Sequence, residues 1–333
     1  MGFAPSVASL GAERLANHGM ELRTPLITAP AGRYQGAPAL IPAVSSIRKR
    51  FASMSTPKNC HYISRFLTKP WETDERILVY YDFRTDQIKR RSSHSLFARD
   101  RLNDPDTERR LNTLMETPMS AQRETIVTGR TDPTDWRAYR AIALLLMLQA
   151  PRSISALGPL DYGDRLAEIL RLPEKELDQL IELWLDRHHL IRYAVPPSER
   201  LFFPSTGVFA LPVTDSTKPG HFDFAFAVPI HPRVFIAYVS ETADVDGIAQ
   251  RAQDGVYHAA ASVGLHSDIV LVPPDLLSFN SHENLCRSIR SWRQGSRELV
   301  ANVVKARELM SDVHQRYGVK LDAEGALKRA RSG

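Results

Sequence analysis

Residues 141–148 form an uninterrupted apolar run, and this run limits the folds open to the chain more than any other segment. Its eight residues fall far short of the roughly 20 that a helix needs to span a bilayer. Asp132-Pro133 upstream is typical of a helix start, and Pro151 predicts that the helix ends within residues 149–152. A helix this apolar must be enclosed by other elements, so the run predicts a central core helix.

Strand-like and helix-like stretches follow one another in groups. Residues 61–91 and 190–240 contain β-branched and aromatic segments separated by turn residues, which predict one strand-rich sheet region. Helical patterns occupy residues 104–188 and 246–317, the second with a break between positions 292 and 296. Asp104-Pro105 offers an N-cap followed by proline at the first helical position. We therefore predict an α+β protein with a mixed or antiparallel sheet packed by helices and a helical C-terminal third.

The net charge of +5 is concentrated in one part of the chain. Residues 1–57 hold six of the 43 basic residues and two of the 38 acidic residues, which leaves 37 basic and 36 acidic residues beyond them. A nearly neutral remainder argues against a general nucleic-acid-binding surface, although nucleic acid stays open as a partner. We predict a disordered basic arm over residues 1–57, a single α+β domain over 58–317 and a frayed charged tail over 318–333.

Cysteine spacing and apolar runs bear on the compartment. Cys60 and Cys286 lie far apart in the sequence, and their spacing fits neither a disulfide framework nor a metal site. The first 57 residues contain no apolar run of the kind found in secretory signals. We therefore expect free thiols, no membrane span and a cytoplasmic protein.

The segment from His61 to Leu67 supplies the first candidate functional residues. His61 and Arg65 lie four positions apart in an aromatic, β-prone stretch, where both polar groups need a partner. A neutral histidine can transfer a proton near pH 7, and an arginine can hold a phosphate or carboxylate with two hydrogen bonds. The alternative is structural: a histidine bonded to the backbone and an arginine paired with a structural acid.

Six short motifs follow one another along the chain. They are His61-Tyr62-Ile63-Ser64-Arg65-Phe66-Leu67, Tyr80-Tyr81-Asp82, Glu116 on a helix, Gln149-Ala150-Pro151-Arg152-Ser153, Pro229-Ile230-His231-Pro232 and Phe279-Asn280. In this order they resemble the family called domain of unknown function 4238, over roughly residues 58–305. Two positions depart from the family pattern: Ser64 stands where the family has proline, and residues 205–208 lack the aspartate of its Thr-Ser-Asp-x-Pro segment. The resemblance implies candidate positions and no reaction.

The motifs yield one group of candidate catalytic residues: His61, Arg65, Glu116 and Arg152. Glu116 could orient the imidazole of His61, and Arg152 could oppose the charge of a phosphate-bearing ligand. We therefore hypothesise a hydrolytic or phosphoryl-directed, nuclease-like site around His61. Alternatively, Glu116 and Arg152 form a buried structural pair on facing helices. The catalytic hypothesis requires the four side chains to converge on one cleft.

Two other hypotheses come from the middle of the chain. Residues 134–204 resemble a winged helix-turn-helix, with residues 192–195 and 200–203 as the wing, but the start of its second helix at 174–179 is acidic and would repel DNA phosphates. The other hypothesis is a non-catalytic interaction module, with residues 163–203 as the partner surface and the basic arm as an electrostatic tether.

Because the histidines lack metal-ligand spacing and no glycine-rich phosphate loop is present, we expect no metal or cofactor.

Overall fold

The computed structural model describes residues 60–99, 103–130, 136–157, 169–215, 217, 222–253, 259, 261–264, 267–317, 319–321 and 327–329. The predicted basic arm over residues 1–57 lies outside them, as does the expected helix start at Asp132-Pro133. Within the described ranges no helix is long and apolar enough to cross a membrane, as the sequence led us to expect.

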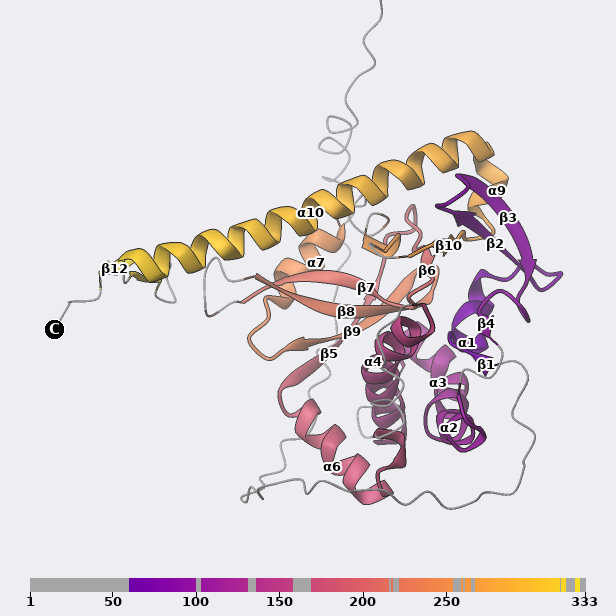
Figure 1. Cartoon of the computed structure of the whole chain (residues 1–333), viewed down its shortest axis with the longest axis horizontal. Coiled ribbons are helices and arrows are strands. Elements are labelled where there is room, and N and C mark those ends of the chain that lie inside the picture. Colours follow the sequence, from indigo (N-terminus) through magenta and orange to yellow (C-terminus); the bar gives the residue numbers. More distant parts are fainter. Residues whose placement is uncertain are drawn as a thin grey trace, which may run out of the picture.

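Two four-stranded antiparallel sheets form the framework of the molecule (Figure 1). One has the order β5-β9-β8-β7, with the strands at His188–Ala194, Val234–Ser240, Phe222–His231 and Phe209–Thr214. The other has the order β3-β2-β10-β6, with the strands at Gln87–Ser92, Ile77–Asp82, Ile269–Leu271 and Phe203–Pro204. Two short pairs are also present: β1 (Cys60–His61) with β4 (Ala98–Arg99), and β11 (Val319–Leu321) with β12 (Leu327–Arg329).

The helices occupy two stretches of the chain. Before β5 come α1 (Arg65–Thr68), the 3-10 turn η2 (Lys69–Trp71), α2 (Pro105–Leu111), the π-helical turn η3 (Asn112–Glu116), α3 (Thr117–Thr128), α4 (Trp136–Leu157) and α6 (Glu174–Leu185). After β9 come α7 (Val245–Gln253), α9 (Leu276–Phe279) and α10 (His282–Tyr317). Antiparallel sheets packed by helices confirm the predicted α+β class.

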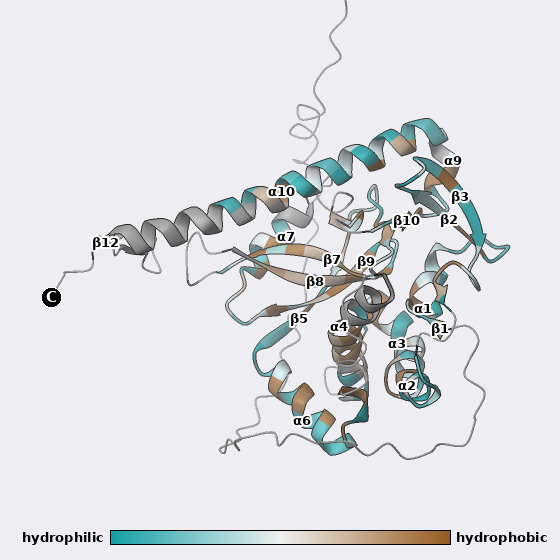
Figure 2. Cartoon of the chain, viewed as in Figure 1, coloured by the Kyte–Doolittle hydropathy of each residue, from teal (hydrophilic) through white to brown (hydrophobic). Residues whose placement is uncertain are grey.

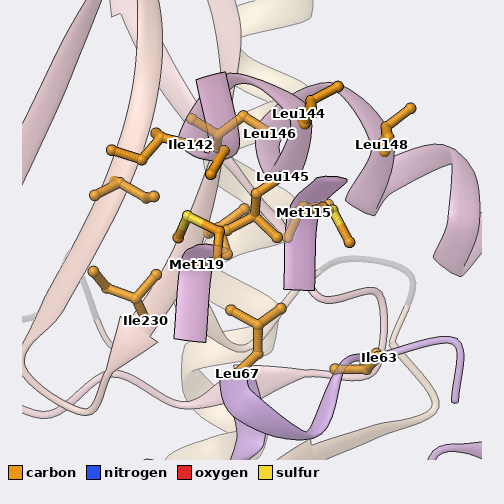
Figure 3. Packing of buried hydrophobic residues seen from close by; sticks show 14 of the residues in the cluster. Ile63, Leu67, Met115, Met119, Ile142, Leu144, Leu145, Leu146, Leu148 and Ile230 are labelled. Atoms are coloured by element: carbon orange, nitrogen blue, oxygen red, sulfur yellow. The ribbon is translucent and has the colours of Figure 1, made fainter. Parts of the chain in front are cut away.

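The predicted core helix is present as α4, and its apolar run is buried. Leu144 and Leu145 are fully buried, and α4 contacts both α3 and β8. Figure 3 shows Leu145 between Met115 of η3 and Met119 of α3, with Ile230 of β8 below Met119. Burying one such side chain contributes about 1.5–3 kcal/mol, so the run organises the packing of the helices against this sheet.

Helix α10 runs across the molecule from the end that carries the sheet β3-β2-β10-β6 (Figure 1). Leu285 and Ile289 on its first turns are buried in one cluster with Tyr81 of β2 and Val270 of β10. This buried stripe fixes the rotation of the helix about its axis. Figure 2 shows that β3 and the first turns of α10 also carry many hydrophilic residues. The hydrophilic residues on the first turns of α10 therefore lie beside the β2–β3 turn.

Two helix boundaries predicted from the sequence are wrong. α4 does not end within residues 149–152 but continues through Pro151 to Leu157. Proline removes one backbone hydrogen bond, and in this 22-residue helix the neighbouring turns continue without it. The expected break between positions 292 and 296 is absent too, because Gly295 lies inside α10. A glycine within a helix costs only about 1 kcal/mol, and the anchored first turns outweigh this.

The strand pairing also differs from the prediction. The strands near residues 61–91 and 190–240 belong to two four-stranded sheets rather than to one sheet region. Which strands join is decided by β10, which arrives late in the chain and pairs with both β2 and β6. At the end of the chain, the segment expected to be a frayed tail contains the paired strands β11 and β12.

The wing expected at residues 192–195 and 200–203 is not formed by the described strands. β5 pairs with β9, and β6 pairs with β10, so the two segments do not make a hairpin. Arg192 of β5 instead donates from Nε to the carbonyl oxygen of Ile126 at 2.7 Å, and a second nitrogen donates to the carbonyl oxygen of Val127. Its guanidinium therefore satisfies the last carbonyl groups of α3.

Candidate functional site

His61 and Arg65 lie at the start of the described chain in different surroundings. His61, in β1, is half-buried, and its Nε2 lies 3.2 Å from the carbonyl oxygen of His94. Arg65, the first residue of α1, is exposed. The imidazole is therefore in contact with the backbone, as in the structural alternative, while the guanidinium is open to solvent.

Glu116 reaches this segment through Ser64. Ser64 is 1% exposed, and its hydroxyl donates to Oε1 of Glu116 at 2.6 Å. Glu116 is half-buried and ends the π-helical turn η3, a distortion that is often found at functional sites. A side chain without a hydroxyl at position 64 could not donate this bond.

Helix α4 also contacts the segment from His61 to Leu67. The side chain of Gln149 is buried and donates from Nε2 to the carbonyl oxygen of Tyr62 at 3.2 Å. Arg152 lies three positions further along the same helix, and its side chain lies outside the described part of the structure. The structure thus brings η3 and α4 to the predicted segment and joins Glu116 to Ser64.

A second site, which the sequence analysis did not predict, lies where α10 passes the sheet β3-β2-β10-β6. It is a cleft of about 420 Å³ between the first half of α10, the β2–β3 turn and the start of β10, and we call it the arginine cleft. Its lining residues are Phe83, Arg84, Ser267, Asp268, Arg290, Arg293, Gln294 and Arg297. Among the lining residues that the structure describes, four carry a guanidinium group and one carries a carboxylate.

Helical spacing places three of these arginines together. Arg290, Arg293 and Arg297 are separated by three and four positions, so their side chains share one face of α10. Arg290 pairs with Asp86 in the β2–β3 turn at 3.4 Å, and the guanidinium carbon of Arg293 lies 3.7 Å from the centre of the Phe83 ring. These contacts, one ionic and one cation–π, hold α10 against the turn.

The opposite wall of the arginine cleft is formed by an ion pair between distant parts of the chain. Arg84 donates from Nη2 to Oδ2 of Asp268 at 2.5 Å, across 184 positions of sequence. Both side chains are largely accessible, at 74% for Arg84 and 49% for Asp268. A ligand entering the arginine cleft can therefore reach both members of the pair.

Positive charge is crowded on the α10 side of the arginine cleft. Burial lowers the pKa of Arg293, and the positive charge of Arg297 lowers it further, while Asp268 and Tyr81 act in the opposite direction. No described residue forms a hydrogen bond or ion pair with the guanidinium of Arg297. Like charges held side by side repel each other, and a bound anion would relieve this repulsion.

The arginine spacing on α10 was visible in the sequence, but its partners were not. A helix with arginines at intervals of three and four positions usually presents a solvated face. The cleft becomes apparent only when β10 brings Asp268 beside Arg84 and the β2–β3 turn approaches α10. Within the described residues, no group of three or more His, Cys, Asp or Glu side chains could hold a metal ion.

Comparison of the chain with protein-family models, with curated proteins and with solved structures gives no match.

Proposed function

We propose that this protein is a binding protein that holds a phosphate-bearing ligand in the arginine cleft. The observation that carries the proposal is the convergence of four guanidinium groups on one cleft whose described lining contains a single carboxylate. Guanidinium groups donate two parallel hydrogen bonds to a phosphate, and they remain charged at any physiological pH. A volume of about 420 Å³ lies within the range of about 300–1,000 Å³ that is usual for small-molecule sites.

The lining favours binding over reaction. Among the described residues the lining contains no histidine, cysteine or glutamate, and its one described acid, Asp268, already accepts a bond from Arg84. A hydrolytic site needs a base within reach of water or substrate, and usually a second acid–base group to protonate the leaving group. The arginine cleft can therefore hold and neutralise an anion, in keeping with a non-catalytic interaction module.

Replacing Arg293 and Arg297 with alanine tests the proposal. We expect the double variant to bind inorganic pyrophosphate at least about tenfold more weakly than the wild type, because hydrogen bonds from charged donors are lost. Isothermal titration calorimetry at low and at high salt measures the change, and wild-type binding should weaken as salt rises.

Arg287→Ala is the matched control for this experiment. Arg287 lies on the same helix, is exposed and pairs with Glu283 outside the arginine cleft. The control should bind pyrophosphate as the wild type does. Equal losses in both variants, or wild-type affinity in the double variant, would contradict a site in the arginine cleft.

A second candidate function, hydrolysis at a site around His61, is supported by the bond between Ser64 and Glu116. This bond holds the half-buried carboxylate of Glu116, at a π-helical turn, against Ser64, which lies three residues along the chain from His61. We propose His61 as the proton-transferring group, with Glu116 orienting its imidazole and with Arg65 and Arg152 opposing the charge of the substrate phosphate. The Ser64–Glu116 bond supports only the placement of Glu116 near this segment.

Hydrolysis of p-nitrophenyl phosphate tests the second candidate. His61→Ala should lower the rate by about 100-fold or more if His61 transfers a proton. His282→Ala, which removes an exposed histidine at the start of α10, should leave the rate unchanged. A folded His61→Ala variant with the wild-type rate, or a wild type without activity, would rule this site out.

A further inference from the structure

Asp268 occupies a fixed position on the wall of the arginine cleft. It directly precedes β10, its backbone N–H donates to the hydroxyl of Ser205 at 3.1 Å, and its carbonyl oxygen accepts from the N–H of Phe83 at 3.0 Å. Its Oδ2 accepts the bond from Arg84. No described residue donates to the other carboxylate oxygen, Oδ1. The residue therefore presents one oxygen that is available to a ligand.

A carboxylate in this position works against the binding of a bare phosphate. The negative charge of Asp268 repels an anion held by the arginines of α10, and it weakens the positive potential of the cleft. An ionised carboxylate only accepts hydrogen bonds, so its best partner is a donor on the ligand. Hydroxyl groups of a sugar are donors of this kind, and carboxylates bind ribose hydroxyls in dinucleotide-binding proteins.

The size and the other lining residues agree with a ligand larger than phosphate. A single phosphate would fill only part of the volume of about 420 Å³. Phe83 adds an aromatic surface to the lining, and Gln294 adds an amide whose Nε2 already donates to Glu298 at 2.7 Å. The arginine cleft thus combines a cationic wall on α10 with an acceptor at the start of β10.

We infer that the arginine cleft takes a sugar phosphate, with the phosphate on Arg290, Arg293 and Arg297 and a sugar hydroxyl on Oδ1 of Asp268. This inference rests on the proposed function and adds to it the chemical class of the ligand. It assigns Asp268 as the residue that distinguishes a phosphate on a polyhydroxy skeleton from a phosphate without hydroxyl groups.

Two probes of the same charge separate the contribution of the phosphate to binding from that of the sugar hydroxyls. Ribose 5-phosphate carries hydroxyl groups, and methyl phosphate does not. Isothermal titration calorimetry should show that the wild type binds ribose 5-phosphate about tenfold more tightly, because one hydrogen bond to a charged acceptor is added. Asp268→Asn should remove most of this preference. Its affinity for methyl phosphate should be unchanged or higher, because a repelling charge is removed.

Two further variants test whether the preference for ribose 5-phosphate depends on Asp268 itself. Asp275→Asn removes a carboxylate that pairs with Arg200 at 2.5 Å outside the arginine cleft, and it should keep both affinities. Arg84→Ala keeps Asp268 but removes its partner, so it should weaken both ligands and preserve the preference for ribose 5-phosphate. Thermal unfolding of each variant confirms that it is folded.

The two proposals fail in different ways. If Asp268→Asn keeps the wild-type preference, Asp268 is only the counter-ion of Arg84, and the inference is overturned while phosphate binding stands. If the wild type binds both probes equally, the sugar-phosphate assignment is also wrong. If Arg293→Ala together with Arg297→Ala leaves both affinities unchanged, the proposed function itself fails.

Discussion

At the scale of single residues, Ser64 determines where the carboxylate of Glu116 is held. Ser64 is buried before α1, Glu116 ends η3, and the hydrogen bond between them joins segments 52 positions apart. A half-buried carboxylate needs such a donor, because leaving it unpaired costs more than the bond contributes.

Removal of the Ser64 hydroxyl should therefore destabilise the protein. We expect Ser64→Ala to lower the free energy of unfolding by about 1–3 kcal/mol, because the hydrogen bond from the buried hydroxyl to Glu116 is lost. Urea unfolding measures the change. Thr113→Ala, at an exposed position within η3, is the control and should change the free energy by no more than about 0.5 kcal/mol. Equal stability of Ser64→Ala and the wild type would show that the bond contributes nothing.

At the scale of secondary-structure elements, the ends of helices follow rules that the sequence already displays. Asp104 is the N-cap of α2 and accepts from the backbone N–H groups of Asp106 and Thr107, both at 3.0 Å. Pro105 follows at the first helical position, as predicted. Burial of the Asp104 carboxyl raises its pKa, but the hydrogen bonds from Thr107 and Asp106 outweigh burial and hold the pKa below its usual value.

The lowered pKa gives the cap a pH dependence of known sign. A carboxyl group whose pKa is lower in the folded protein stabilises it above the unfolded-state pKa, and this contribution is lost as pH falls through the folded-state pKa. Asp104→Ala should lower the free energy of unfolding by about 1 kcal/mol at neutral pH. Urea unfolding should show that the difference from the wild type shrinks in acid. A difference independent of pH would show that ionisation of Asp104 is not involved.

At the scale of the whole molecule, positive charge is divided between the arm and the arginine cleft. Residues 1–57 carry an excess of four basic residues, whereas the rest of the chain is nearly neutral. The arginine cleft is thus a local concentration of positive charge in a part of the chain that is nearly neutral as a whole. Electrostatic attraction by the arm would act over a distance of about 10 Å at 0.1 M salt, so it adds to a binding site without replacing it.

Deletion of residues 1–53 tests the contribution of the arm. We expect the shortened protein to bind polyphosphate more weakly at low salt, and the difference should disappear at high salt because the charges are screened. The unfolding temperature should not change. Fluorescence titration over a series of salt concentrations measures the effect, and an unchanged salt profile would count against the tether hypothesis.

The sequence was most informative for elements whose structure depends on residues close to one another in the chain. β-branched and aromatic segments separated by turn residues predicted strands within residues 61–91, and β2 and β3, paired from Ile77 with Ser92 to Asp82 with Gln87, confirm them. The apolar run predicted α4 as the core helix. The candidate site was less predictable, because the bond between Ser64 and Glu116 joins segments 52 positions apart and no local pattern indicates it. The role of Glu116 in orienting His61 stays a prediction.

What the sequence determined by itself is the set of helices, strands and caps whose signals act over a few positions, since hydrogen bonds and side-chain periodicity are local there. The tertiary structure alone decided which strands share a sheet and which charges meet. Arg84 and Asp268 are brought together by the pairing of β10 with β2, and Arg290 reaches Asp86 because a buried stripe fixes the rotation of α10. Such contacts depend on how distant segments pack, and no periodicity within one segment encodes them.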